Sequence, residues 1–372
     1  MDAVVPVTLR VSSAPASQVL QAIRVSAPVT RDALAAATGL SPATINRQVT
    51  ALLDLGFVVE RPDLVPPGVI GRPKNPLTLD RDRLCVAGMH IGARRATLVV
   101  ADIGGRILHS HAVLTPRDAA PDTAVRHLSA QLAELAGRFS GRRLLWGGVA
   151  LSGRIDSDTG VVDHPVLGWR RVGLGAELAA ALGVPVSVCE HVQAMAAAEM
   201  LLSSARHVED SGLFCYARET TGLAVTVAGQ VMMPARGAGT IAHVRVDAPV
   251  IFGGPAMLQQ VIGVRAAQRA AERLGVSPDA AAIVDERARI LGEVVAVFRD
   301  ALNPGSVVVA GDAFAGHPQG LAPVQAAFDA ASNVGWQLEL TPSRFGLSIQ
   351  ASAAVVVALS VLYADPGRAG SM

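Results

Sequence analysis

The residues best suited to chemistry with a partner lie at positions 41–48, which read SPATINRQ. No acidic residue occurs from Ser41 until Asp54. Hydroxyl, amide and guanidinium groups are the donors and acceptors that proteins use against base edges and phosphates of DNA. A helix with one short polar face of this kind is typical of a major-groove reader. We expect base-edge contacts from Thr44, Asn46 and Arg47, and phosphate or base-edge contacts from Ser41 and Gln48.

A pair of helices joined by a tight turn is predicted to hold this face. Thr30 can cap the first helix, and Gly39 supplies the backbone freedom to leave it. Ser41 can cap the second helix, with Pro42 at its first position. Apolar residues of the second helix recur at i, i+4 and i+7 and are expected to form its buried side; they are Ile45, Val49 and Leu52. The alternative interpretation is an ordinary helical hairpin whose polar face is merely solvated.

A β-hairpin wing is predicted after the second helix. Residues 57–60 (FVVE) read as one strand and residues 76–79 (PLTL) as its partner. The Gly-Arg-Pro-Lys turn between them can present Arg72 and Lys74 to a minor groove or to the DNA backbone. The wing favours DNA binding over a solvated hairpin. We expect a winged helix-turn-helix domain and its linker over residues 1–83.

Composition describes a globular protein with local rather than global charge. The chain has 372 residues, 51% of them hydrophobic and 17% charged, with a formal net charge of +1. Binding to nucleic acid must therefore come from local groups. The three cysteines match no metal-ligand spacing and predict reduced thiols in a cytoplasmic protein.

No signal peptide or membrane span is expected. Residues 1–17 lack a basic start followed by an apolar run, and they are expected to form a loose arm. The most apolar segment, residues 353–363, is shorter than the roughly 20 residues that span a bilayer. We expect it to be a core helix.

From residue 84 onward strands alternate with helices, which predicts an α/β domain. Strands are expected at 84–92, 96–101, 106–113, 144–151, 185–189, 212–217, 223–228, 230–233 and 306–310. Helices are expected at 122–139, 194–202, 257–274 and 278–301. An order of three strands, helix, strand and helix occurs twice, which predicts two related lobes with a cleft between them.

These motifs resemble the ROK family, whose regulators join a winged helix-turn-helix to a sugar-kinase-like domain of the actin/hexokinase-like (ribonuclease H-like) fold. The resemblance rests on SPATINRQVTALLDLGFVVE, GRPKNPLTL, GMHIGARRATLVVADIGGRIL, GVPVSVCEHVQAMAAAE, GAGTIAH and NPGSVVVAGDAF, in matching order and spacing. It implies a ROK domain over residues 84–372. Lobe one is expected at about 84–185 plus the C-terminal helix, and lobe two at about 186–350.

Departures from the family pattern indicate loss of kinase activity. Active members carry roughly Asp-x-Gly-Gly-Thr-Lys in the first loop, where residues 90–95 read His-Ile-Gly-Ala-Arg-Arg. The catalytic Asn-Asp pair is matched by Glu190 and His191. A kinase needs a carboxylate to accept the proton of the attacking sugar hydroxyl. We therefore expect no enzyme activity and no cofactor.

The family's zinc and sugar sites are altered as well. The family's zinc site consists of a Gly-Glu-x-Gly-His motif and three cysteines, and of its four ligands only His243 remains in this sequence. One imidazole cannot hold a structural zinc, so no metal is expected. Two alternatives stay open for the polar residues at the former sugar site. They line a remodelled pocket for another effector, such as a sugar derivative or an anion, or they are relics satisfied by local hydrogen bonds. These residues are Glu190, His191, Thr240 and His243, with His164 nearby.

The sequence thus predicts a cytoplasmic, bacterial-type transcriptional regulator, a repressor, that binds a pseudo-palindromic operator as a homodimer or tetramer. Two rival hypotheses remain. In one, the ROK domain is an effector-independent scaffold. In the other, the protein is a working sugar kinase with an appended DNA-binding domain.

Overall fold

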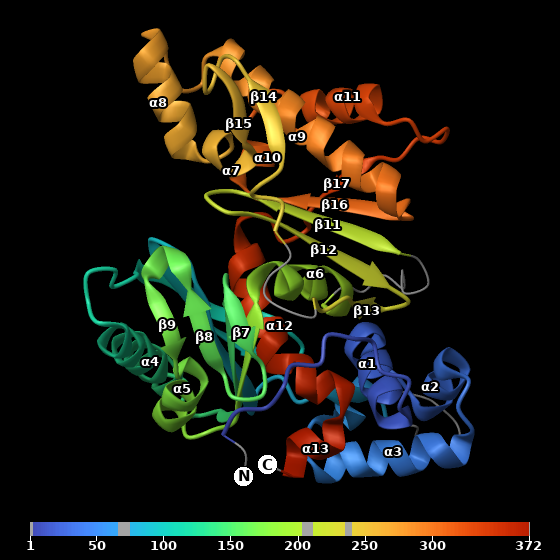
Figure 1. Ribbon diagram of the computed structural model, residues 1–372. Coiled ribbons are helices and arrows are strands. Elements are labelled where there is room, and N and C mark those ends of the chain that lie inside the picture. Colours follow the sequence, from blue (N-terminus) through green and yellow to red (C-terminus); the bar gives the residue numbers. More distant parts are fainter. Residues whose placement is uncertain (1–2, 66–74, 203–210, 235–239, 372) are drawn as a thin grey trace. The chain divides into compact units, whose positions relative to one another are not determined.

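The structure is a computed structural model that describes residues 3–65, 75–202, 211–234 and 240–371 (Figure 1). The chain forms two compact units, Met1–Arg206 with Gln350–Met372, and His207–Ile349. A five-stranded sheet lies at the centre of each unit.

Three helices and a short hairpin form the N-terminal domain, here called the head (residues 15–65 and 75–79). Its elements are α1 (Pro15–Ser26), α2 (Arg31–Thr38), α3 (Pro42–Asp54), β1 (Val58–Glu60), a 3-10 turn (Pro62–Leu64) and β2 (Leu77–Leu79). Strand β1 pairs antiparallel with β2. The predicted helix pair and both strands of the wing are confirmed. The turn that carries Arg72 and Lys74 lies outside the described residues.

The predicted capping residues determine where α2 and α3 begin. Thr30 Oγ1 accepts a hydrogen bond from Ala33 N at 3.4 Å, and Ser41 Oγ accepts one from Thr44 N at 3.2 Å. Gly39 ends α2 with a φ of +70°. These contacts satisfy N–H groups that have no partner inside their own helix. The core of the head includes Val19, Leu20, Ile23, Leu34, Ile45, Val49 and Leu52, together with buried residues of the wing such as Phe57 and Leu77.

The sheet of the first unit has the strand order β10-β6-β3-β4-β5. Its strands are β3 (Leu84–Ile91), β4 (Arg95–Asp102), β5 (Ile107–Leu114), β6 (Arg143–Leu151) and β10 (Val186–Glu190). The remaining helices of this unit are α4 (Pro121–Gly137), α5 (Leu174–Leu182), α6 (His191–Leu201), α12 (Ile349–Ala364) and α13 (Pro366–Ser371). A smaller antiparallel sheet contains β7 (Arg154–Asp156), β8 (Val161–His164) and β9 (Trp169–Val172).

Alternation along the strands gives this sheet two different faces. Ala87 and Met89 of β3 belong to the apolar core shared with α4 and α5. Between them, Gly88 lies opposite Gly148 of β6, and a Cβ added to either would come within 3.0 Å of α12. The absence of side chains at these two positions lets α12 lie directly against the other face (Figure 1).

Strand β10 differs from the sequence analysis in its placement. Lobe two was expected from about residue 186, but Val186 pairs in parallel with Gly147 of β6, so β10 extends the first sheet. The N-terminal arm lies on the same edge, because Val4 bridges Val186 and Val5 N donates to Val186 O at 2.9 Å. The expectation of a loose arm is therefore wrong for residues 3–5. An edge strand offers unpaired backbone groups, which explains the pairing.

The sheet of the second unit has the strand order β13-β12-β11-β16-β17. Its strands are β11 (Gly212–Ala217), β12 (Thr221–Val227), β13 (Gln230–Val231), β16 (Ser306–Ala310) and β17 (Leu340–Pro342), and β14 (Arg245–Ala248) pairs separately with β15 (Gly254–Met257). Its helices are α7 (Leu258–Val261), α8 (Val264–Leu274), α9 (Ala281–Leu302), α10 (Asp312–Ala315) and α11 (Ala322–Ala331). In both sheets three antiparallel strands are followed by two parallel ones, which confirms the predicted repeat.

One described helix is long and apolar enough to cross a membrane. The 3-10 turn Gly346–Ser348 and α12 together form the segment Gly346–Ala364, which has 19 residues and a mean hydropathy of 1.9, but 78% of its apolar window is buried inside the protein. The helix is longer than the predicted 353–363, so the argument from length was wrong. Its burial against the sheet supports the predicted core helix.

Candidate nucleic-acid interface and effector cluster

Helix α3 presents the predicted reading face to solvent. Its apolar side is at most 1% exposed, which turns the opposite side outward. Asn46 and Arg47 are exposed, and Thr44 and Gln48 are half-buried. Within the described part of the chain, no hydrogen bond or ion pair engages the Asn46 or Arg47 side chain. Their donors and acceptors are thus available to a partner.

The N-terminus of α3 adds two hydroxyl groups to this face. Ser41 is exposed, and its Oγ lies 3.0 Å from Thr44 Oγ1. N–H groups of a first helical turn and the helix dipole favour a nearby anion such as a phosphate. All five predicted residues of α3 and its cap therefore lie outside the buried side of the helix, three of them exposed and two half-buried.

The base of the wing is held by polar contacts. Glu60 at the end of β1 pairs with Arg31 at 2.9 Å and accepts from Asn75 Nδ2 at 2.8 Å. These hydrogen bonds, first from Asn75 and then from Arg31, lower the pKa of Glu60. Arg72 and Lys74, the other predicted DNA contacts, lie outside the described residues.

Glu190, His191 and His90 form a buried polar cluster in the first unit. Nε2 of His90 lies 3.2 Å from Nδ1 of His191, and the two rings stack with centroids 5.4 Å apart. His191 Nε2 lies 3.4 Å from Glu190 Oε1. Glu190 also caps α6, because its Oε2 accepts from Val192 N at 2.7 Å and Gln193 N at 3.1 Å. The N-terminus of α6 therefore orients the carboxyl group, and the carboxyl group faces the imidazole.

Burial dominates the electrostatics of this cluster. Desolvation raises the pKa of Glu190 to about 8, although the N–H groups of Gln193 and Val192 oppose the rise. Desolvation also lowers the pKa of His191 well below its ordinary value, and His90 and His164 add to the effect. At neutral pH the pair is thus a protonated carboxyl beside a neutral imidazole.

His164 lies in the same unit and is fixed by two contacts. Its Nδ1 accepts from Leu167 N at 3.3 Å, so the ring proton belongs on Nε2, which lies 3.0 Å from Ser152 Oγ. Desolvation lowers the pKa of His164. The imidazole is therefore neutral and acts as a donor to Ser152.

Thr240 and His243 belong to the second unit. Thr240 Oγ1 donates to Thr221 O at 3.3 Å and accepts from Ala242 N at 3.1 Å. Both Thr240 and His243 are exposed. Convergence of these two residues with Glu190 and His191 stays a prediction.

Sequence reasoning missed the partnership of His90 with His191. His90 was noted only as a replacement for the carboxylate of the phosphate loop. Its place near the carboxyl end of β3, and that of His191 directly after β10, were a usable signal, since carboxyl ends of parallel strands meet at one edge of a sheet. The signal was incomplete because the strand order was unknown.

Comparison with known proteins identifies both parts of the chain. The model of the ROK family matches residues 86–331, and the model of winged helix-turn-helix DNA-binding domains matches residues 17–59. Transcriptional regulator Mb0495 of Mycobacterium bovis is 42% identical and covers 98% of this chain and 89% of its own length. The xylose repressor of Bacillus subtilis is 24% identical over 63% of this chain and 60% of its own.

Solved structures share the fold. A ROK family transcriptional regulator, described as a homologue of the Escherichia coli MLC protein, has a TM-score of 0.78 at 20% identity and covers 96% of this chain and 98% of its own. The ROK hexokinase of Thermus thermophilus has a TM-score of 0.59 at 26% identity over 74% of this chain and 98% of its own. The chain therefore belongs to the ROK family and carries a winged helix-turn-helix in front of its ROK domain.

Proposed function

We propose that this protein is a DNA-binding transcriptional regulator, a repressor, which recognises a pseudo-palindromic operator as a homodimer or tetramer. The observation that carries the proposal is the exposed, acid-free face of α3. The names of the relatives, a transcriptional regulator and a xylose repressor, support the same function. Such a protein acts in the cytoplasm, where the bacterial chromosome lies.

In the proposed complex α3 enters the major groove with its N-terminal end leading. Thr44, Asn46 and Arg47 meet base edges, while Ser41 and Gln48 meet phosphates or base edges. The wing residues Arg72 and Lys74 meet the minor groove or the backbone. Two heads related by symmetry read two half-sites.

Fluorescence anisotropy with duplexes from promoters of the protein's own locus tests the proposal. We expect one fragment to bind at about 10⁻⁸ M or tighter at physiological salt, roughly 10³-fold tighter than a scrambled duplex of equal length. Equal affinity for every promoter fragment and for scrambled DNA would overturn the proposal.

The ROK domain is proposed to lack kinase activity. Both ring nitrogens of His191 are engaged, Nδ1 with His90 and Nε2 with Glu190, and the ring is 5% exposed. A general base must reach the substrate hydroxyl with a free lone pair, which this arrangement does not offer. A coupled assay of ADP release with ATP and a panel of hexoses should show no turnover. Turnover that disappears in His191→Ala would refute this part of the proposal.

The ROK domain is further proposed to take a sugar or sugar-derived molecule, with Glu190, His191, Thr240 and His243 as the candidate residues that contact it. A bound ligand stabilises the folded state by RT ln(1 + [L]/Kd), so a saturable rise in melting temperature with sugars or sugar phosphates is expected. No shift with any compound of the panel would favour the scaffold alternative.

A further inference from the structure

Arg24 of the head is held at the C-terminus of α6. Its Nη2 donates to Leu201 O at 2.8 Å and its Nη1 to Leu202 O at 3.3 Å. The last carbonyls of a helix have no partner within the helix and carry partial negative charge, so a guanidinium is a favourable group at this end. Helix α1 is therefore tied to a helix of the ROK domain by charge-assisted hydrogen bonds.

Other contacts fix the guanidinium itself. Arg24 Nε donates to Gln21 Oε1 at 2.9 Å, and the guanidinium lies 5.5 Å from the ring centroid of Tyr363 on α12. The Tyr363 hydroxyl donates in turn to Ile103 O at 3.0 Å. The residue thus joins α1, α6 and α12 at one point.

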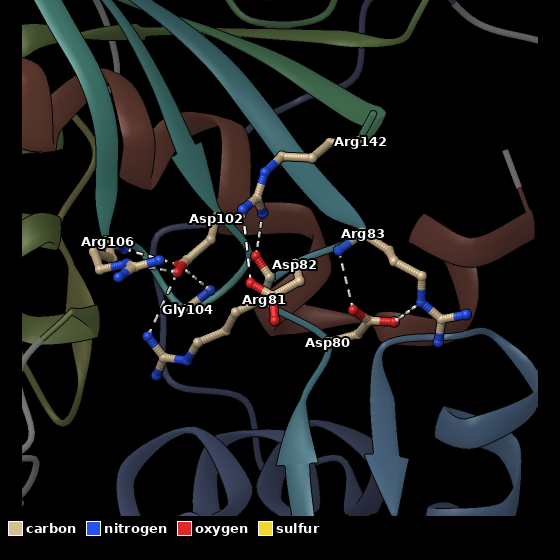
Figure 2. A network of polar contacts seen from close by, with 8 residues as sticks. All are labelled: Asp80, Arg81, Asp82, Arg83, Asp102, Gly104, Arg106 and Arg142. Carbon is tan, nitrogen blue, oxygen red and sulfur yellow. Dashed lines mark hydrogen bonds and ion pairs between the residues drawn. The ribbon is translucent and has the colours of Figure 1, made fainter. Parts of the chain in front are cut away.

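A second attachment lies in the linker that follows β2 (Figure 2). Asp102 at the end of β4 is 0% exposed and lies 3.6 Å from Arg81 Nη1 and 3.3 Å from Arg106 Nε. Its Oδ1 also accepts from Gly104 N at 2.9 Å and Arg106 N at 3.0 Å. Because the carboxylate is buried and already oriented by the β4–β5 turn, the linker arginine meets a fixed partner.

Arg142 makes further contacts to the same linker, and the linker also has an ion pair of its own. Arg142 donates to Arg81 O and lies 3.7 Å from Asp82 Oδ1. Asp80 Oδ2 accepts from Arg83 Nε at 2.6 Å. Figure 2 shows these groups following one another along the linker. The joint between head and ROK domain is therefore a network of ion pairs and not an open tether.

Three separate attachments have a geometric consequence. A rigid body held at two points can still rotate about the line that joins them, whereas a third point off that line fixes its direction. The head is held at Arg24 and at the linker, and Ser17 Oγ adds a hydrogen bond to Ala364 O at 2.7 Å. The head and the first sheet accordingly belong to one compact unit. The direction of α3 relative to that sheet is thus determined by the chain itself.

We propose, resting on the regulator function above, that Arg24 and Asp102 are positioning residues that fix the direction of α3 on the ROK domain and thereby set the half-site spacing of the operator. In a dimer, heads of fixed direction read half-sites at one separation, because a change of one base pair moves and rotates the second half-site. Heads on free tethers would tolerate several separations.

The test uses full-length protein and half-sites selected from a random duplex library by the wild type. Duplexes carry the two half-sites at centre-to-centre separations that differ by single base pairs, and anisotropy measures each affinity. We expect the wild type to lose at least tenfold in affinity one base pair from its best separation. Arg24→Ala and Asp102→Asn should flatten this profile to threefold or less, and Arg24→Lys should restore part of it. Arg138→Ala, at the exposed C-cap of α4, serves as the matched control and should keep the wild-type profile.

A merely structural role would weaken binding equally at all separations, so a parallel shift of the profile would overturn the proposal. A second measurement is independent of DNA. Spin labels at Ala51→Cys on α3 and Ala130→Cys on α4, both exposed, report the direction of the head, since the three native cysteines are buried. With labelled chains diluted in unlabelled protein, pulsed electron resonance should give one narrow distance in the wild type and a broad distribution in Arg24→Ala.

The outcomes separate this proposal from the function on which it rests. If no selected duplex binds, the regulator function fails and the spacing role fails with it. Binding by the wild type with identical profiles or identical distance distributions in the variants refutes the positioning role alone.

Discussion

Replacing Glu190 by glutamine should remove a pH dependence of stability that the buried cluster creates. Burial raises the pKa of Glu190 to about 8 from an ordinary value of 4.5. Between these values the folded protein keeps a proton that the unfolded chain has released, so stability falls as the pH rises. His191 acts in the opposite direction below pH 6.5, because burial lowers its pKa and only the unfolded chain takes up that proton.

The two contributions oppose each other between pH 4.5 and 6.5. From pH 6.5 to about 8 only the Glu190 contribution remains. At about 1.4 kcal/mol per pH unit, this window corresponds to a loss of about 2 kcal/mol in the free energy of unfolding. Glutamine keeps an oxygen that can accept from Val192 N and Gln193 N. The variant therefore loses the titration while it retains the helix cap.

Urea unfolding at pH 6.5 and pH 8 measures the difference. In a Trp336→Phe background the fluorescence comes from Trp146 and Trp169, both 2% exposed in the first unit. The background protein should lose about 2 kcal/mol more than the Glu190→Gln variant over this range. Glu134→Gln, at an exposed position of α4, should follow the background protein. Equal pH slopes with and without Glu190 would refute the argument from burial.

Three further substitutions test the head and the first sheet. Arg47→Ala should weaken operator binding by about 1–3 kcal/mol and relax the sequence preference at one base pair. Unchanged affinity and unchanged sequence preference in fluorescence anisotropy would show that Arg47 does not contact a base. Ser41→Ala should destabilise the head by about 0.5–2 kcal/mol in thermal unfolding, whereas Ser41→Asn keeps a capping oxygen and should not. Gly148→Ala should lower the free energy of unfolding in urea by about 1–3 kcal/mol, because its Cβ would lie 2.4 Å from Ala358 N. Gly137→Ala, with no atom within 4 Å of the added carbon, should not lower it.

The secondary structure of the head could be predicted from the sequence because the sequence features that determine it are local. A cap lies within three residues of the N–H that it satisfies, as Thr30 and Ser41 show. The buried side of α3 repeats within one helix, and the glycine that ends α2 needs no distant partner. The repeated succession of strands and helices along the chain was predictable for the same reason, since each strand is marked by its own apolar run, whereas the order of the strands in the sheet was not.

Only part of the candidate effector cluster could be predicted from the sequence. Glu190 and His191 stand together in the sequence, but His90 is separated from His191 by 101 positions and reaches it only because the sheet takes the order β10-β6-β3. The raised pKa of Glu190 is likewise a property of its surroundings, because burial and not the residue type produces it.

By itself, the amino-acid sequence determined the helix-turn-helix, its capping residues and the two related sheets, and it predicted the reading residues and the absence of kinase activity. Only the tertiary structure decided that the N-terminal arm extends the first sheet, that α12 lies against Gly88 and Gly148, and that Arg24 meets a carbonyl 177 positions away. The physical reason is the range of each interaction. Periodicity and capping act within a few residues, whereas strand pairing at an edge, close packing of a helix on a sheet and ion pairing across domains depend on which distant surfaces the folded chain brings into contact.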